Sequence, residues 1–120
     1  MPARRILLAE DEQTISKLIQ KVLAAAGHDV VGVTSAAEAI ERLAGNGWDL
    51  LLLDLNLDDG DGLPVIDAIA RLGKHPPVVV MTGESDFEDG ATAGPVAGVL
   101  RKPFDLDELE RIVERYGASA

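Results

Sequence analysis

Five short runs along this chain contain only apolar residues and glycine. Four to five apolar residues in a row are typical of strands that are buried on both faces of a parallel sheet. The strongest run is four consecutive leucines that break at Asp54 into a stretch of acids and glycines, which is typical of a loop. The predicted strands are Ile6–Ala9, Val30–Val33, Leu50–Leu53, Val78–Met81 and Val96–Leu100.

Helical patterns separate the runs. Apolar residues recur every three or four positions from Ile15 to Leu23, and Gly27 follows as a C-terminal signal. Ser35 to Glu38 forms a capping box for a second helix, and the Gly62 to Leu72 segment has helical spacing. Asp105 caps a last helix that carries Leu106, Leu109, Ile112 and Val113 on one face.

The segment between the fourth and fifth runs is the weakest helix candidate. Ser85 to Gly94 contains Gly90 and Gly94, is followed by Pro95, and has no clear apolar stripe. We therefore expect a fourth helix that is short or irregular. Strands that alternate with helices predict an α/β fold, a doubly wound parallel sheet with helices on both faces.

Composition limits the possible functions. The 120 residues fit one domain, with no linker or repeat that divides residues 1–120, and the absence of cysteine excludes disulfides and thiolate metal sites. A formal charge of -10 argues against direct binding to nucleic acid or to an anionic membrane. The amino terminus has neither a secretion signal nor a spanning segment, so we expect a cytoplasmic protein.

Groups with related chemistry follow four of the predicted strands. Glu10 and Asp11 follow the first, Asp54 the third, Thr82 the fourth and Lys102 the fifth. The carboxyl ends of parallel strands meet at one edge of a sheet, where open α/β sheets place their ligands. Three carboxylates there repel one another, and Mg²⁺ is the simplest counter-ion for them.

The lysine and the threonine supply what a phosphoryl group needs besides a metal. Lys102 offers positive charge and Thr82 a hydroxyl donor, and an aspartate carboxylate is an accepted nucleophile for forming an acyl phosphate. The set therefore suggests phosphorylation of Asp54 itself.

These motifs together resemble the response-regulator receiver domain of two-component signalling, from about Arg5 to Tyr116. The resemblance implies a flavodoxin-like (βα)5 fold with strand order 2-1-3-4-5 and a phosphate carrier rather than an enzyme acting on outside substrates. The matching residues are Glu10-Asp11, Asp54 with Asn56 and Gly62, Thr82-Gly83, and Lys102-Pro103-Phe104.

The resemblance also implies a role for each matching position. Asp54 would be the phosphoacceptor, and Asp11 would ligate Mg²⁺ directly, Glu10 through water and Asn56 through its backbone carbonyl. Thr82 and Lys102 would contact the phosphoryl group alone, and only once it is present. Gly83 would leave the acyl phosphate approachable, and a cis peptide before Pro103 would aim the lysine.

Partners follow from the same resemblance. The phosphodonor would be a sensor histidine kinase or a histidine phosphotransfer protein, and the output would be a downstream protein target or a linked domain. We expect a monomer or a weak phosphorylation-dependent dimer. Whether the chain acts alone or belongs to a longer regulator stays open, with a stand-alone regulator favoured.

Three features depart from the family pattern. Asp58 stands where proline is usual, in an acidic loop with Asp59 and Asp61, which we interpret as a solvated turn. Val99 replaces the switch aromatic, so an aromatic rotamer flip cannot report phosphorylation. The Thr82 to Lys102 interval is slightly short, and we expect ordering of residues 84–94 to act as the switch.

Other functions were weighed against this one. A haloacid dehalogenase-type phosphohydrolase would need a second acid where Asn56 stands, and a flavodoxin would need aromatics, which are only 3% of residues. A receiver-shaped scaffold that is never phosphorylated is a minor alternative, since all expected positions are filled. Trp48 is interpreted as packing, and His28 and His75 as surface turn residues.

Overall fold

The structure is a computed structural model of the chain. It describes residues 4–45, 47–57, 60–61, 63–72, 75–83 and 96–117. In that part of the chain, no helix is both long and apolar enough to cross a membrane.

Five parallel strands form the central sheet, in the order β2-β1-β3-β6-β7. Counted along the chain, these strands are in the order 2-1-3-4-5, so the predicted topology is confirmed. Their bounds are β1 Arg5–Ala9, β2 Asp29–Val33, β3 Leu50–Asp54, β6 Val78–Thr82 and β7 Val96–Arg101.

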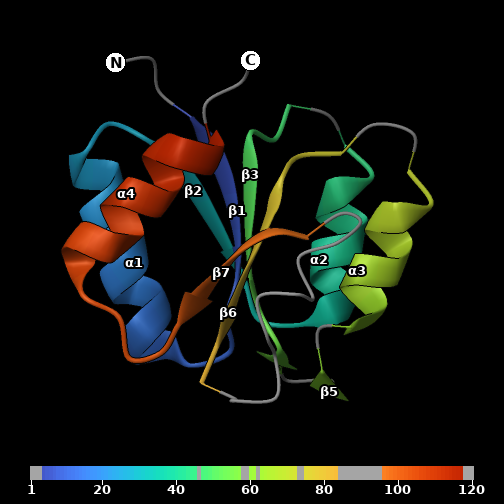
Figure 1. The fold of residues 1–120 in the computed structure, drawn as a ribbon. Coiled ribbons are helices and arrows are strands. Elements are labelled where there is room, and N and C mark those ends of the chain that lie inside the picture. The colour runs from blue at the N-terminus through green and yellow to red at the C-terminus, as the bar shows by residue number, and fades with distance from the viewer. Residues whose placement is uncertain are drawn as a thin grey trace.

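Among the described residues, two pairs of helices cover the sheet (Figure 1). α1 and α4 lie over one face, and α2 and α3 over the other. Their bounds are α1 Gln13–Ala25, α2 Ala36–Leu43, α3 Leu63–Ala70 and α4 Leu106–Gly117. The helix expected at 85–94, and with it the proposed switch at 84–94, lies outside the described residues.

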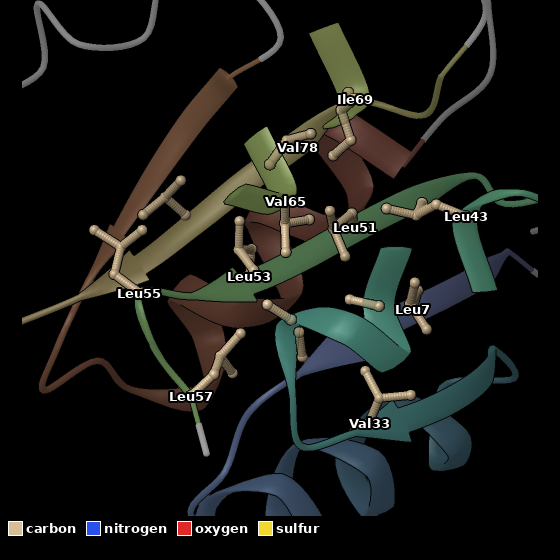
Figure 2. Packing of buried hydrophobic residues seen from close by; sticks show 14 of the residues in the cluster. Leu7, Val33, Leu43, Leu51, Leu53, Leu55, Leu57, Val65, Ile69 and Val78 are labelled. Carbon is tan, nitrogen blue, oxygen red and sulfur yellow. The ribbon is translucent and has the colours of Figure 1, made fainter. Parts of the chain in front are cut away.

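Alternation along β1 and β3 divides their side chains between the two faces. Ile6 and Leu8 pack with α1 and α4, whereas Leu7 lies in the cluster under α2 and α3 (Figure 2). All four leucines from Leu50 to Leu53 have no exposed surface. The run must be apolar at every position, because successive side chains point to opposite faces of the sheet and helices cover both faces.

The helix ends follow the predicted local signals. Ser35 Oγ accepts a hydrogen bond from the Glu38 N–H at 3.1 Å, and Asp105 Oδ1 accepts one from the Glu108 N–H at 2.8 Å. Gly27 has a φ of 95°, a left-handed conformation that glycine adopts without strain after a helix. α3 stops two residues before the predicted Leu72, whose N–H donates to the Ile69 carbonyl in a tighter turn.

A small hairpin follows the sheet's third strand and was not predicted. β4 (Asn56–Leu57) pairs antiparallel with β5 (Gly60–Asp61). Leu57 is 6% exposed and belongs to the apolar cluster beneath α2 and α3. The interpretation of the acidic loop as a solvated turn stays a prediction, because Asp58 and Asp59 lie outside the described residues.

Candidate functional site

Three carboxylates lie together at the carboxyl edge of the sheet. Asp54 is the last residue of β3, and Glu10 and Asp11 follow β1 directly. One oxygen from each of the three lies within 4.8 Å of the others. Glu10 has no exposed surface and Asp54 is 3% exposed, whereas Asp11 is half-buried, so two of the three carboxylates are withdrawn from water.

Lys102 bridges two of these carboxylates. Its Nζ lies 2.9 Å from Glu10 Oε1 and 2.5 Å from Asp54 Oδ2. The lysine follows β7 directly and its side chain is 23% exposed, so it reaches inward from the rim of the site. The expectation that Lys102 contacts the phosphoryl group alone is wrong, because the lysine already serves as counter-ion to the resting carboxylates.

Backbone N–H groups hold the remaining carboxylate oxygens. The Asn56 N–H donates to Asp54 Oδ1 at 2.8 Å, and the Glu12 N–H donates to Glu10 Oε2 at 3.3 Å. Each of the two buried carboxylates is thus fixed by a backbone donor at one oxygen and by Lys102 at the other. Buried carboxylates need such partners, because an unpaired charge is costly to bury.

Thr82 and Lys102 are joined through the backbone. Thr82 ends β6 and is 1% exposed, and its carbonyl accepts a hydrogen bond from the Lys102 N–H at 2.9 Å. Gly83 is exposed, and a side chain there would begin 3.8 Å from the Lys102 Cβ. The Lys102–Pro103 peptide is cis, as predicted.

The site perturbs the ionisation of Glu10 and Lys102. Burial, reinforced by the neighbouring Asp54, raises the pKa of Glu10 to about 7, although Lys102 opposes the rise. Burial by itself lowers the pKa of Lys102, but the Asp54 and Glu10 carboxylates outweigh it, so that pKa is raised. The lysine is therefore charged, while Glu10 takes up a proton more readily than an ordinary glutamate.

The structure brings the predicted site residues to one edge of the sheet. Glu10, Asp11, Asp54 and Lys102 form the cluster, and Thr82 joins it through its backbone bond to Lys102. Asn56 is exposed and reaches the site through its N–H. Sequence reasoning missed the Glu12 N–H, because a backbone donor leaves no signal in residue type.

The family model described as "Response regulator receiver domain" matches residues 6–114. The chain belongs to this receiver-domain family. Family membership makes it a two-component signalling module rather than an enzyme that turns over outside substrates. Receiver domains interact with histidine kinases, which limits the class of phosphodonor to be considered.

Curated relatives are longer proteins. The chain is 36% identical over 106 residues to the swarming motility regulation protein RssB of Serratia marcescens, covering 87% of this chain and 48% of that protein. It is 33% identical over 114 residues to the DNA-binding transcriptional regulator NtrC of Escherichia coli K12, covering 92% of this chain and 24% of NtrC. The chain therefore spans half or less of these relatives.

Solved receiver domains share the fold over nearly the whole chain. The signal receiver domain of a putative Luxo repressor protein from Vibrio parahaemolyticus matches with a TM-score of 0.87 at 24% identity, covering 97% of this chain and 91% of that one. The receiver domain of sensor histidine kinase PA1611 from Pseudomonas aeruginosa matches with a TM-score of 0.85 at 26% identity, covering 98% and 100%. That structure holds a magnesium ion in its active-site cleft.

Proposed function

We propose that residues 1–120 form a single receiver domain that accepts a phosphoryl group on Asp54 and signals through protein contacts. The phosphodonor is a phosphohistidine of a sensor histidine kinase or a histidine phosphotransfer protein. The observation that carries the proposal is the buried Asp54 carboxylate, which lies within 4.8 Å of two further acids and is paired with Lys102.

The phosphoryl transfer needs no reactant besides Asp54 and the phosphohistidine. A carboxylate oxygen of Asp54 attacks the phosphorus as the P–N bond to the histidine breaks, and the imidazole leaves with the electron pair of that bond. The product is an acyl phosphate on Asp54 and a free histidine. Burial of the carboxylate, with Lys102 beside it, keeps competing water away and places positive charge where the transferred group gains negative charge.

The donor set fits Mg²⁺, which prefers a few carboxylates and keeps some of its waters. Asp11 and Asp54 would hold the ion directly, Glu10 through water and Asn56 through its backbone carbonyl. When bound, Mg²⁺ would supply charge to a phosphoryl oxygen and relieve the repulsion among the acids. A magnesium ion in the PA1611 receiver supports this assignment.

The protein's own groups complete the contacts to phosphate. Thr82 would donate its hydroxyl to one phosphoryl oxygen and Lys102 would leave Asp54 to pair with another. Gly83 leaves the approach open, because no side chain covers the acid there. Pro103, which follows the lysine, would set the direction from which its side chain enters the site.

We propose that the donor protein docks in a groove next to the site. Lys102 also lines an apolar groove of about 350 Å³ between α1 and the start of α4. Leu18 and Leu106 on its walls are 49% and 42% exposed, unusual values for large apolar side chains. Lys102 lines the groove and also contacts Asp54, so a protein seated in the groove would lie beside the acid. Its other lining residues are Ile15, Ile19, Pro103 and Phe104.

A small donor with a P–N bond tests the chemistry apart from docking. The wild-type chain is incubated with phosphoramidate, with Mg²⁺ or with a chelator, and then treated with hydroxylamine, which converts an acyl phosphate to a hydroxamate. We expect a Mg²⁺-dependent hydroxamate at Asp54 in the peptide map. Modification at another acid, or none with Mg²⁺ present, would contradict the proposal.

A further inference from the structure

His28 lies between the end of α1 and the start of β2, at the amino-terminal edge of the sheet, whereas Asp54 ends β3 at the opposite edge. Its ring Nδ1 accepts a hydrogen bond from the Arg4 backbone N–H at 3.2 Å. The next residue, Asp29, donates its own N–H to the Arg4 carbonyl at 2.9 Å. His28 and Asp29 thus hydrogen-bond to the backbone N–H and the backbone carbonyl of Arg4, respectively. The histidine is half-buried in the turn that joins α1 to β2.

This hydrogen bond requires a neutral ring. A nitrogen that accepts has no proton, so the proton of neutral His28 lies on Nε2. When the ring is protonated, both nitrogens donate, and Nδ1–H then faces the Arg4 N–H with no acceptor between them. Protonation therefore turns an attractive contact into a repulsive one.

The Arg4 side chain adds to the repulsion. It is only 7% exposed, and its Nε and Nη1 are buried without a hydrogen-bond partner in the described structure. A second positive charge beside a buried guanidinium is unfavourable, because the low dielectric screens it weakly. Arg4, the residue just before β1, therefore has no described side-chain hydrogen bond from Nε or Nη1 that could offset the loss of its backbone contact.

Charged groups on the neighbouring elements affect the pKa of His28. Burial and the Arg4 charge on the β1 side lower the pKa of His28, while Glu114 of α4 opposes them. On the β2 side, Asp29 lies 4.0 Å from the Arg5 guanidinium, which offsets its charge. The last turn of α1 carries no basic residue. The balance favours the neutral ring that the hydrogen bond needs.

We propose that His28 is a pH-sensitive latch, whose protonation releases the Arg4 backbone and opens the start of β1 while the Asp54 edge stays folded. The latch is closed when the ring is neutral and opens as the pH falls below the ordinary histidine range, near about 6.5. The unfolded chain binds the proton more tightly than the folded one. Stability therefore falls as the pH drops through this range.

Amide hydrogen exchange of the full chain tests the latch. Protection of the Arg4 N–H, corrected for the intrinsic exchange rate at each pH, is compared with that of Leu7 at the centre of β1. The two control variants are H28N, whose side-chain oxygen can replace the Nδ1 acceptor without titrating, and H28A, which has no acceptor.

We expect wild-type Arg4 to lose protection from about pH 7.5 to about pH 5 while Leu7 keeps its protection. Arg4 should stay protected throughout in H28N and be unprotected throughout in H28A. Constant protection in the wild type would overturn the latch, as would H28N following the wild type. A parallel loss at Leu7 would show general unfolding and would also overturn it.

Discussion

Lys102 Nζ lies 2.5 Å from Asp54 Oδ2, and its side chain occupies the centre of the acidic site. The lysine therefore has two tasks in sequence: it neutralises Glu10 and Asp54 at rest, and it pairs with the phosphoryl group in the proposed phosphorylated state. Its backbone bond to Thr82 ties the ends of β6 and β7 together. If the lysine moves, we expect the ends of both β6 and β7 to shift with it.

Removal of this counter-ion should destabilise the metal-free protein. Lys102→Met leaves the buried Glu10 and Asp54 charges without their shared cation, and we expect the free energy of unfolding to fall by about 2 kcal/mol. Added Mg²⁺ should recover part of the loss. Chemical denaturation in chelator and in Mg²⁺ measures both effects, with Lys17→Met on the exposed face of α1 as the control. Equal stabilities for the two variants would contradict the counter-ion role.

The raised pKa of Glu10, about 7, predicts an unusual pH dependence for the metal-free protein. Between the ordinary glutamate pKa of 4.5 and about 7, the folded state binds the proton more tightly than the unfolded state. Stability is therefore lost as the pH rises through this window. Glu10→Gln should remove this trend and raise the free energy of unfolding by about 1 to 3 kcal/mol near pH 8.

Denaturation curves across this pH range, recorded in chelator, measure the Glu10 effect. Glu12→Gln is the matched control, because Glu12 is exposed two residues away. A trend that persists in Glu10→Gln would assign the titration to another group.

Packing at β7 depends on a glycine. A side chain at Gly98 would begin 2.8 Å from Tyr116 Cε2 and 2.9 Å from its Cζ, closer than rigid ring atoms allow. Gly98→Ala should therefore cost about 1 to 3 kcal/mol. In a double-mutant cycle with Tyr116→Ala the penalty should shrink, because the clashing ring is gone. Gly45→Ala, with its nearest contact at 3.4 Å, serves as the control.

The docking groove can be tested separately from the chemistry. Leu18→Glu places a charge on the exposed wall of the groove, so phosphotransfer from a kinase or phosphotransfer protein that serves the wild type should slow. Phosphorylation by phosphoramidate should be unchanged, since Leu18 does not contact Asp54. Leu72→Glu, a 36% exposed leucine after α3, is the control. Equal slowing in both variants would exclude a specific role for the groove.

The sequence was sufficient for the sheet and for the edge where the site forms. The leucine run before Asp54 and the acids, threonine and lysine at other strand ends predict it, because parallel strands end on one edge. The reach of the Lys102 side chain into the resting site could not be predicted, because it depends on three-dimensional distances. The same holds for His28, whose position in a turn gives no sign of its contact with Arg4.

Asp54→Asn removes one of the three crowded carboxylates, which by itself would stabilise the fold. Because Lys102 already offsets that crowding, and Glu10 keeps its own contact to the lysine, we expect little change in stability. The variant is therefore suited to test function without a loss of folding.

The most direct test of the account is the intact mass after incubation with phosphoramidate and Mg²⁺. Wild type and Asp67→Asn, a control on the exposed surface of α3, should each gain the mass of one phosphoryl group. Asp54→Asn should gain none, and a chelator should prevent the gain in wild type and in Asp67→Asn. An adduct of equal yield in Asp54→Asn, or none in the wild type, would contradict the assignment of Asp54 as phosphoacceptor.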